Sequence, residues 1–228
     1  MESVAKSRRK STARSHKKGD ATRAHILKAA RDCFNRMGIS EVTCRTIAEH
    51  AGLSSGNVYY YFDNKDIILG ELRLELESAT RNLLAGISAR RMNTDEDRRA
   101  LADQWMDMVW TWRFIFQDIH QLTRGNSRTR EALLDIRRES VSLHQELFEE
   151  HLINRGLDLT PKDKAFCHNL AITNWIIATN WLQHLCLEKG ELEITREDFK
   201  AGMDPFLTLW RLFYDDSLQD RLRGKPLS

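Results

Sequence analysis

The amino-acid sequence predicts an all-α protein. Only three prolines and 11 glycines occur in 228 residues, too few turn-forming residues for a fold of many short strands. Apolar residues recur instead at intervals of three and four, the repeat that places them on one face of a helix. A content of 41% hydrophobic and 30% charged residues is typical of a folded globular protein, which excludes a fibre or a wholly disordered chain.

The charges divide the chain into two parts. Residues 1–65 carry 13 basic and 6 acidic side chains, whereas residues 66–228 carry 22 basic and 27 acidic ones. The overall net charge of +2 therefore conceals a basic first part, and such a part indicates a surface for nucleic-acid phosphates. No apolar run reaches the ~18 residues of a membrane helix, and no apolar stretch of a secretory signal follows the basic start. We therefore expect a cytoplasmic protein with no membrane partner.

Residues 1–19 are predicted to form a disordered basic arm. They include seven Lys or Arg side chains and few large apolar residues, so they cannot bury enough surface to offset the entropy of ordering. Such an arm either lies along nucleic-acid phosphates or is a solvated tail with no partner, and the sequence leaves both possibilities open.

A first helix is predicted between Asp20, a suitable N-cap, and Gly38, a suitable left-handed residue at its end. Thr43 is expected to cap a short helix that runs to about Ala51, and Gly52 to make the following turn. Ser54 is expected to cap a second short helix that runs to about Phe62. Asp63 or Asn64 then caps a long helix, whose predicted apolar face carries Ile68, Leu72, Leu76, Ala79, Leu83 and Ile87.

The spacing of Ala48, Gly52 and Val58 is typical of a helix-turn-helix. Two short helices that cross steeply need a small residue at the crossing, a residue that tolerates positive φ in the turn, and a branched apolar anchor on the second helix. The alternative is an ordinary helical hairpin. The small polar residues at the start of the second helix favour the first interpretation, because Asn57 can there bond a base edge bidentately.

The run from Thr43 to Lys65, TCRTIAEHAGLSSGNVYYYFDNK, resembles the DNA-binding signature of the TetR family of bacterial transcriptional regulators. The resemblance covers about residues 21–70. It implies an all-helical subunit with a three-helix DNA-binding domain at 20–65. A helical ligand-binding and dimerisation domain would follow at 66–228.

The resemblance also implies roles for single residues. Thr43 and Lys65, each at the start of a helix, are expected to contact phosphate, and Arg45 to reach phosphate or a base. Tyr61 stands where the family most often has His, so its contact is left open. The expected DNA contacts are Thr43, Arg45, Ser54, Ser55, Gly56, Asn57, Tyr59, Tyr60 and Lys65.

All six tryptophans lie between positions 105 and 210. One predicted helix face carries Trp105, Val109, Trp112, Phe116 and Ile119. This stripe is either plain core or the wall of a cavity for an apolar or aromatic effector, as the resemblance implies. Asn174, an amide in apolar surroundings, either orients a ligand or satisfies backbone groups. The pocket candidates are Trp105, Val109, Trp112, Phe116, Asn174 and Trp175.

The segment 163–187 is apolar on two sides, which favours a helix covered once by its own subunit and once by a partner. Together with a last helix at 196–215 it is predicted to form a homodimer, as two-fold operators require. The alternative is a monomer core. The interface candidates are Ala178, Trp181, Leu182, Leu185, Phe206, Trp210 and Phe213.

Together with the resemblance, these patterns imply a dimeric repressor that binds double-stranded operator DNA and is released from it by a small apolar or aromatic effector. A regulator without an effector, or one whose ligand promotes DNA binding, stays an alternative. An enzyme is disfavoured because no catalytic fingerprint is present. No cofactor and no metal site is predicted, and the four cysteines, which lack C-x-x-C spacing, are expected to be reduced.

Overall fold

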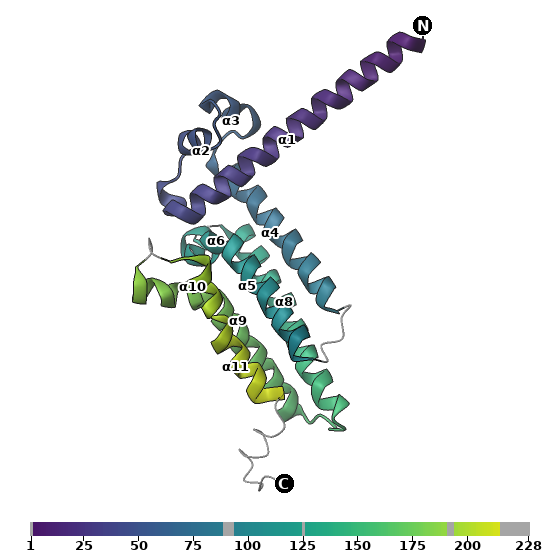
Figure 1. The fold of residues 1–228 in the computed structure, drawn as a ribbon, viewed down its shortest axis with the longest axis vertical. Coiled ribbons are helices and arrows are strands. Elements are labelled where there is room, and N and C mark those ends of the chain that lie inside the picture. Colours follow the sequence, from purple (N-terminus) through teal and green to yellow (C-terminus); the bar gives the residue numbers. More distant parts are fainter. Residues whose placement is uncertain (1, 89–93, 125, 191–193, 215–228) are drawn as a thin grey trace. The chain divides into compact units, whose positions relative to one another are not determined.

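The computed structural model describes residues 2–88, 94–124, 126–190 and 194–214 (Figure 1). Every regular element in these ranges is a helix, which confirms the predicted all-α class. Contacts between the helices divide the chain into two compact units, residues 1–76 and 77–228. None of the described helices is long and apolar enough to cross a membrane.

The first unit contains α1 (Glu2–Glu41), α2 (Cys44–His50), α3 (Ser55–Tyr61) and the beginning of α4 (Lys65–Ser88). All four helices contribute to one apolar core. Its most buried side chains, each at most 1% exposed, are Ile26, Ala30, Phe34, Ile47, Val58, Phe62, Ile68 and Leu72. The apolar face predicted for the first half of α4 is thus confirmed.

Side-chain caps begin the three helices that follow α1. The Thr43 hydroxyl accepts a hydrogen bond from the Thr46 backbone N–H at 3.1 Å, and the Ser54 hydroxyl accepts one from the Asn57 N–H at 3.2 Å. Of the two caps predicted for α4, the structure uses Asn64, whose Oδ1 accepts from the Ile67 N–H at 3.1 Å. Each cap satisfies an N–H that the helix itself leaves without a partner.

The N-cap predicted at Asp20 was wrong. Helix α1 begins at Glu2, so Asp20 lies inside the helix instead of capping it. The sequence before Asp20 contains no proline, and once a stable helix is nucleated each added residue gains one hydrogen bond. The predicted end of the helix is confirmed, because Gly38 has φ 76° and interrupts the regular turns there.

The boundary between the units lies within α4, after Leu76, and not at residue 65. The first three turns of α4 belong to the first unit because Ile68, Leu72 and Leu76 are fully buried there. An ion pair between Arg23 and Glu71 joins the same turns to α1.

The second unit contains the end of α4, then α5 (Asp95–Thr111), α6 (Arg113–Gln117), α7 (Ile119–Thr123), α8 (Ser127–Asn154), α9 (Pro161–Lys189), α10 (Arg196–Ala201) and α11 (Met203–Tyr214). Helices α8 and α9 form a long antiparallel pair (Figure 1). A hydrogen bond of 2.8 Å between the His168 ring and the Gln145 side chain fixes their register.

In this unit the buried face of α4 differs from the prediction by one position. Thr80 and Leu84 are buried, whereas Ala79 and Leu83 are half-buried; the side chain of Ile87 lies outside the described residues. The Thr80 hydroxyl donates to the Met108 sulfur on α5 at 3.5 Å, so a polar residue occupies this buried position with a partner.

Gly202, between α10 and α11, allows a close approach to α9. A Cβ at this position would lie 2.1 Å from Nε1 of Trp181. Real contacts never reach this distance, so only glycine leaves room for the indole ring.

We expect Gly202→Ala to lower the free energy of unfolding by about 1–3 kcal/mol, because the added methyl group displaces the Trp181 ring from a packed site. Gly86→Ala on α4 is the matched control, since its Cβ would meet nothing within 4 Å. Its helix propensity should raise stability by up to about 1 kcal/mol. Urea unfolding followed by circular dichroism measures both; equal stabilities of the two variants would contradict the close packing.

Candidate functional site

Helices α2 and α3 form the helix-turn-helix that the spacing of Ala48, Gly52 and Val58 predicts. Ala48 and Val58 are both buried, with 1% and 0% exposure. Gly52 has φ 65°, the left-handed conformation that the turn requires. The Leu53 N–H closes the turn by donating to the Ala48 carbonyl at 2.9 Å. This arrangement holds the start of α3 rigidly at the surface.

The exposed side of α3 presents small and aromatic groups and no acidic side chain. Ser54, Gly56 and Asn57 are exposed, Ser55 is half-buried, and Tyr60 is 82% exposed. The Asn57 amide forms no hydrogen bond within the part of the chain that the structure describes. It therefore keeps the donor and acceptor pair that can bond an adenine edge.

Two of the expected phosphate contacts also serve the structure of the first unit. The Lys65 ammonium donates to the Ile39 carbonyl at 2.7 Å and so ties the start of α4 to the end of α1. Its remaining N–H groups can still face an anion. Arg45 pairs with Glu49 at 2.9 Å, but both side chains are mostly exposed, and such a surface pair contributes little stability. Arg45 can therefore exchange Glu49 for a phosphate.

Tyr59 has a structural contact that the sequence did not indicate. Its hydroxyl hydrogen-bonds the Cys44 thiol, which lies at the start of α2. Burial raises the pKa of the Cys44 thiol, so the group stays protonated and inert at neutral pH. The contact joins the two helices of the motif to each other.

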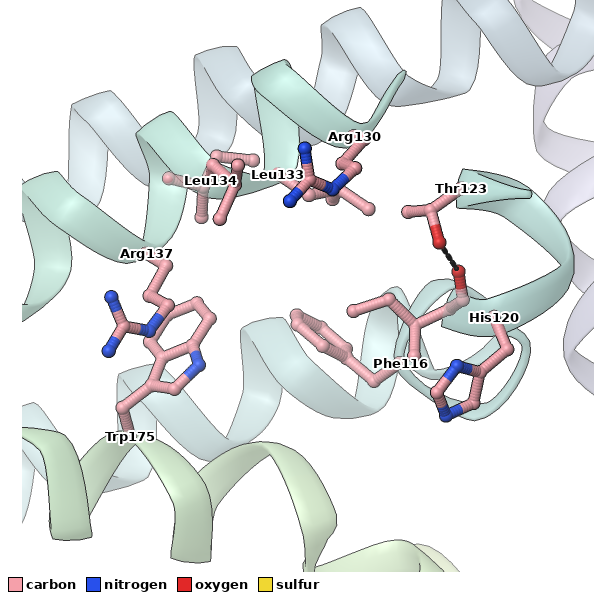
Figure 2. A pocket seen from close by; sticks show the side chains of 10 residues that line it. Phe116, His120, Thr123, Arg130, Leu133, Leu134, Arg137 and Trp175 are labelled. Atoms are coloured by element: carbon pink, nitrogen blue, oxygen red, sulfur yellow. Dashed lines mark hydrogen bonds between the residues drawn. The ribbon is translucent and has the colours of Figure 1, made fainter. Parts of the chain in front are cut away.

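The second unit contains a cavity of about 260 Å³ between α6, α7, α8 and α9. Figure 2 shows Arg130, Leu133, Leu134 and Arg137 projecting from α8, and Trp175 from α9. The lining residues are Phe116, Ile119, His120, Thr123, Arg130, Leu133, Leu134, Ile136, Arg137 and Trp175. The cavity combines a mostly apolar wall with a few polar groups, as ligand sites do.

Two family profiles match the chain. "Bacterial regulatory proteins, tetR family" matches residues 26–72, which contain the helix-turn-helix, and "Bacterial transcriptional repressor" matches residues 76–220, more than half of the chain. The chain belongs to the TetR family. Both the DNA-binding motif and the second unit are thereby accounted for by one family.

Curated relatives of this TetR-family chain match it over shorter stretches. The regulator BetI 2 of Chromohalobacter salexigens is 32% identical over 75 residues, which are 33% of this chain and 35% of that protein. The regulator TtgR of Pseudomonas putida is 38% identical over 52 residues, 23% of this chain and 25% of that protein. The chain thus aligns with about a third or less of these two relatives.

A solved structure matches nearly the whole chain. A TetR-family transcriptional regulator from Marinobacter aquaeolei VT8 has a TM-score of 0.72 and 26% identity, and the match covers 90% of this chain and 99% of that one. The two-unit plan of the TetR-family subunit therefore extends over both proteins.

Only two of the predicted pocket residues, Phe116 and Trp175, line the cavity. Trp105 is buried behind it, with its ring centroid 5.8 Å from that of Trp175. Val109, Trp112 and Asn174 are buried but do not line it. The predicted stripe assumed one helix, whereas α5 ends at Trp112 and the chain turns again at Asp118. These breaks bring α7 and α8 into the wall, and their lining residues were missed except for Ile119, which belonged to the predicted stripe.

Most predicted interface residues are instead core of their own subunit. Ala178, Leu182, Leu185, Trp210 and Phe213 are each at most 5% exposed within one chain. Trp181 is half-buried beside Gly202, and the side chain of Phe206 lies outside the described residues. The exposed face of α9 carries other side chains, Asn169, Thr173, Ile176, Asn180, His184 and Leu187.

His144 on α8 is a buried titratable group in this unit. Its ring lies edge-on to Trp105 and Trp210, with centroid distances of 5.7 and 6.0 Å, and its Nδ1–H donates to the Ser140 carbonyl at 2.7 Å. Burial lowers the pKa of His144, and the hydrogen bond opposes this only in part. The folded protein therefore keeps this imidazole neutral.

Because the pKa of His144 is lower in the folded state than its ordinary 6.5, the unfolded chain binds a proton that the folded chain does not. The free energy of unfolding should thus fall as the pH drops from 7 to 5. For this one group the decrease is at most about 1.4 kcal/mol per pH unit. His144→Phe should flatten this slope, and the exposed His120→Gln should not. Urea unfolding at several pH values tests this; an unchanged slope in His144→Phe would refute it.

Proposed function

We propose that this chain is a sequence-specific, DNA-binding transcriptional regulator, a dimeric repressor that a small effector releases from its operator. The observation that carries the proposal is the exposed, polar start of α3, held in place by the buried Ala48 and Val58. A recognition helix of this kind fits the major groove, where its first residues meet base edges. Membership of the TetR family supports the same function.

The two parts of the chain before and after position 65 differ in net charge as such a regulator requires. The net positive charge lies in the first 65 positions, where it favours binding to phosphates in the bacterial cytoplasm, the place of the chromosome. Seven of the basic residues in this part precede Asp20 and belong to the first half of α1. We expect them to contact phosphates beside the operator.

The exposed face of α9 supports dimerisation. Residues 165–187 contain no Lys, Arg, Asp or Glu, and Ile176 and Leu187 are 52% and 89% exposed. An uncharged helix face with large exposed apolar groups is typical of an interface. A two-fold dimer would place two copies of α3 one helical turn of DNA apart, about 34 Å.

The cavity supports an effector. Helix α4 runs from Lys65, next to α3 in sequence, into the second unit, so both units share one helix. A ligand that binds the DNA-free form more tightly than the DNA-bound form would shift the protein away from the operator.

Asn57→Ala tests the assignment of the recognition helix. The variant should lose about 1–3 kcal/mol of discrimination between operator and scrambled DNA, because the bidentate contact to a base is removed. The operator is first selected from random duplexes with the wild-type protein, and fluorescence anisotropy then compares both DNAs. Asn154→Ala, an exposed amide at the end of α8, is the control. If Asn57→Ala discriminates between the two DNAs as well as the wild type does, Asn57 does not read a base.

Ile176→Asp tests the interface on α9. A charge in the middle of this uncharged face should convert dimers to monomers, because an interface carboxylate would be buried without a partner. Ile153→Asp on α8 places the same charge at an equally exposed isoleucine and should leave the dimer intact. Sedimentation equilibrium distinguishes the two; a stable Ile176→Asp dimer would rule out this face.

A further inference from the structure

The cavity in the second unit has an apolar wall and a positively charged rim. Its aromatic and aliphatic residues come from α6, α7, α8 and α9, and its charged side chains, Arg130 and Arg137, both come from α8 (Figure 2). None of its ten lining residues is acidic. A wholly apolar effector would gain nothing from this positive charge next to the aromatic rings.

Neighbouring arginines on α8 show how Arg137 differs. Arg138, the next residue, is exposed and donates to Asp135 at 2.8 Å. Arg130 has a distant pairing with Glu131 at 3.9 Å, and both of these side chains are more than half exposed. Arg137 is half-buried, and across residues 2–88, 94–124, 126–190 and 194–214 its guanidinium forms no ion pair and no hydrogen bond.

An unused guanidinium on the wall of a cavity favours an anionic ligand. A charge that is partly removed from water is costly without a partner, and the five N–H groups of arginine match a carboxylate in a bidentate pair. Of the other polar groups, His120 can donate a hydrogen bond to an anion, whereas the Thr123 hydroxyl already donates its hydrogen to the Ile119 carbonyl at 2.7 Å. A cationic ligand would instead meet two like charges.

The rest of the cavity defines the body of this ligand. Phe116 and Trp175 present their rings to it, with centroids 6.4 Å apart, and Leu133 lies on α8 beside them. The volume of about 260 Å³ is below the ~300–1,000 Å³ typical of sites for drug-sized molecules. The body must therefore be apolar and compact.

We propose that the effector is a compact organic anion, a carboxylate on an apolar or aromatic body. The carboxylate pairs with Arg137, Arg130 attracts it at the rim, and the body packs against Phe116 and Trp175. This inference rests on the proposed effector-responsive function, and it specifies which chemical class the cavity selects.

The experiment compares three probes of one shape and different charge: 3-phenylpropanoate, 3-phenylpropanamide and 3-phenylpropylamine. Isothermal titration calorimetry with the full-length protein should show the carboxylate binding at least about tenfold more tightly than the amide and the amine, as expected for a charge-assisted pair. Benzoate and octanoate extend the series to a shorter and a longer body.

Arg137→Gln should weaken carboxylate binding by about tenfold or more and leave amide binding unchanged. Arg138→Gln, one residue further on the same helix and paired with Asp135, should bind the carboxylate like the wild type. If Arg137→Gln fails to fold, Arg137→Lys replaces it; it keeps the charge but not the bidentate geometry and should still weaken binding.

Three results would overturn the inference. The first is that the amide or the amine binds as tightly as the carboxylate, and the second is that the carboxylate affinity does not depend on Arg137. The third is that none of the three carboxylates shows saturable binding at millimolar concentration. Any of these results would show that charge does not select the ligand.

Operator DNA separates this inference from the proposed function. If the amide or amine releases the protein from its operator, and the cavity-filling Leu133→Trp prevents this, the effector-responsive function is supported and the anionic class is wrong. If carboxylates bind through Arg137 but never change DNA affinity, the anion site stands and the effector role of the cavity is wrong.

Discussion

The lack of charge along helix α9 is the constraint on which the second unit depends. Residues 165–187 form six turns without a single Lys, Arg, Asp or Glu, so only uncharged polar groups and imidazoles solvate this stretch. Most of its girth is covered by the subunit itself, through α5, α8 and α11. What stays exposed includes the large apolar groups of Ile176 and Leu187, on the face that we propose as the dimer interface.

A continuous series of aromatic contacts surrounds α9 and supports the cavity. Phe213 packs on Phe148 at 4.9 Å, and Trp210 joins Phe148 to His144. Trp105 continues the series from His144 to Trp175, the residue of α9 that faces the cavity. Large rings interdigitated in this way leave few alternative rotamers. The wall that a ligand meets at Trp175 is thus held from behind.

The first unit could be predicted in detail because its structure depends on local rules. Thr43, Ser54 and Asn64 act as caps through bonds to backbone groups three residues away, and Gly52 adopts the positive φ that a tight turn demands. Each of these features can be identified from a few consecutive residues. The N-cap of α1 was predicted wrongly at Asp20, since a suitable capping residue does not stop a helix that continues through it.

The cavity and the interface could not be predicted, for two different physical reasons. The breaks at Trp112 and Asp118 involve neither proline nor glycine, so no local signal marks the points where α5, α6 and α7 separate. Helix α9 is apolar on two sides, and periodicity cannot tell the side on its own core from a side toward a partner. In both cases packing between distant segments decides the outcome.

The local charge of the cavity is opposite to that of the unit that contains it. Residues 66–228, which include this unit, carry more acidic than basic side chains, an excess that disfavours contact with DNA phosphates. Arg130 and Arg137 are therefore not a consequence of average composition. In an acidic unit an anion is repelled at long range and gains only where a guanidinium is close. Selection for a small anion must therefore depend on the two arginines of α8.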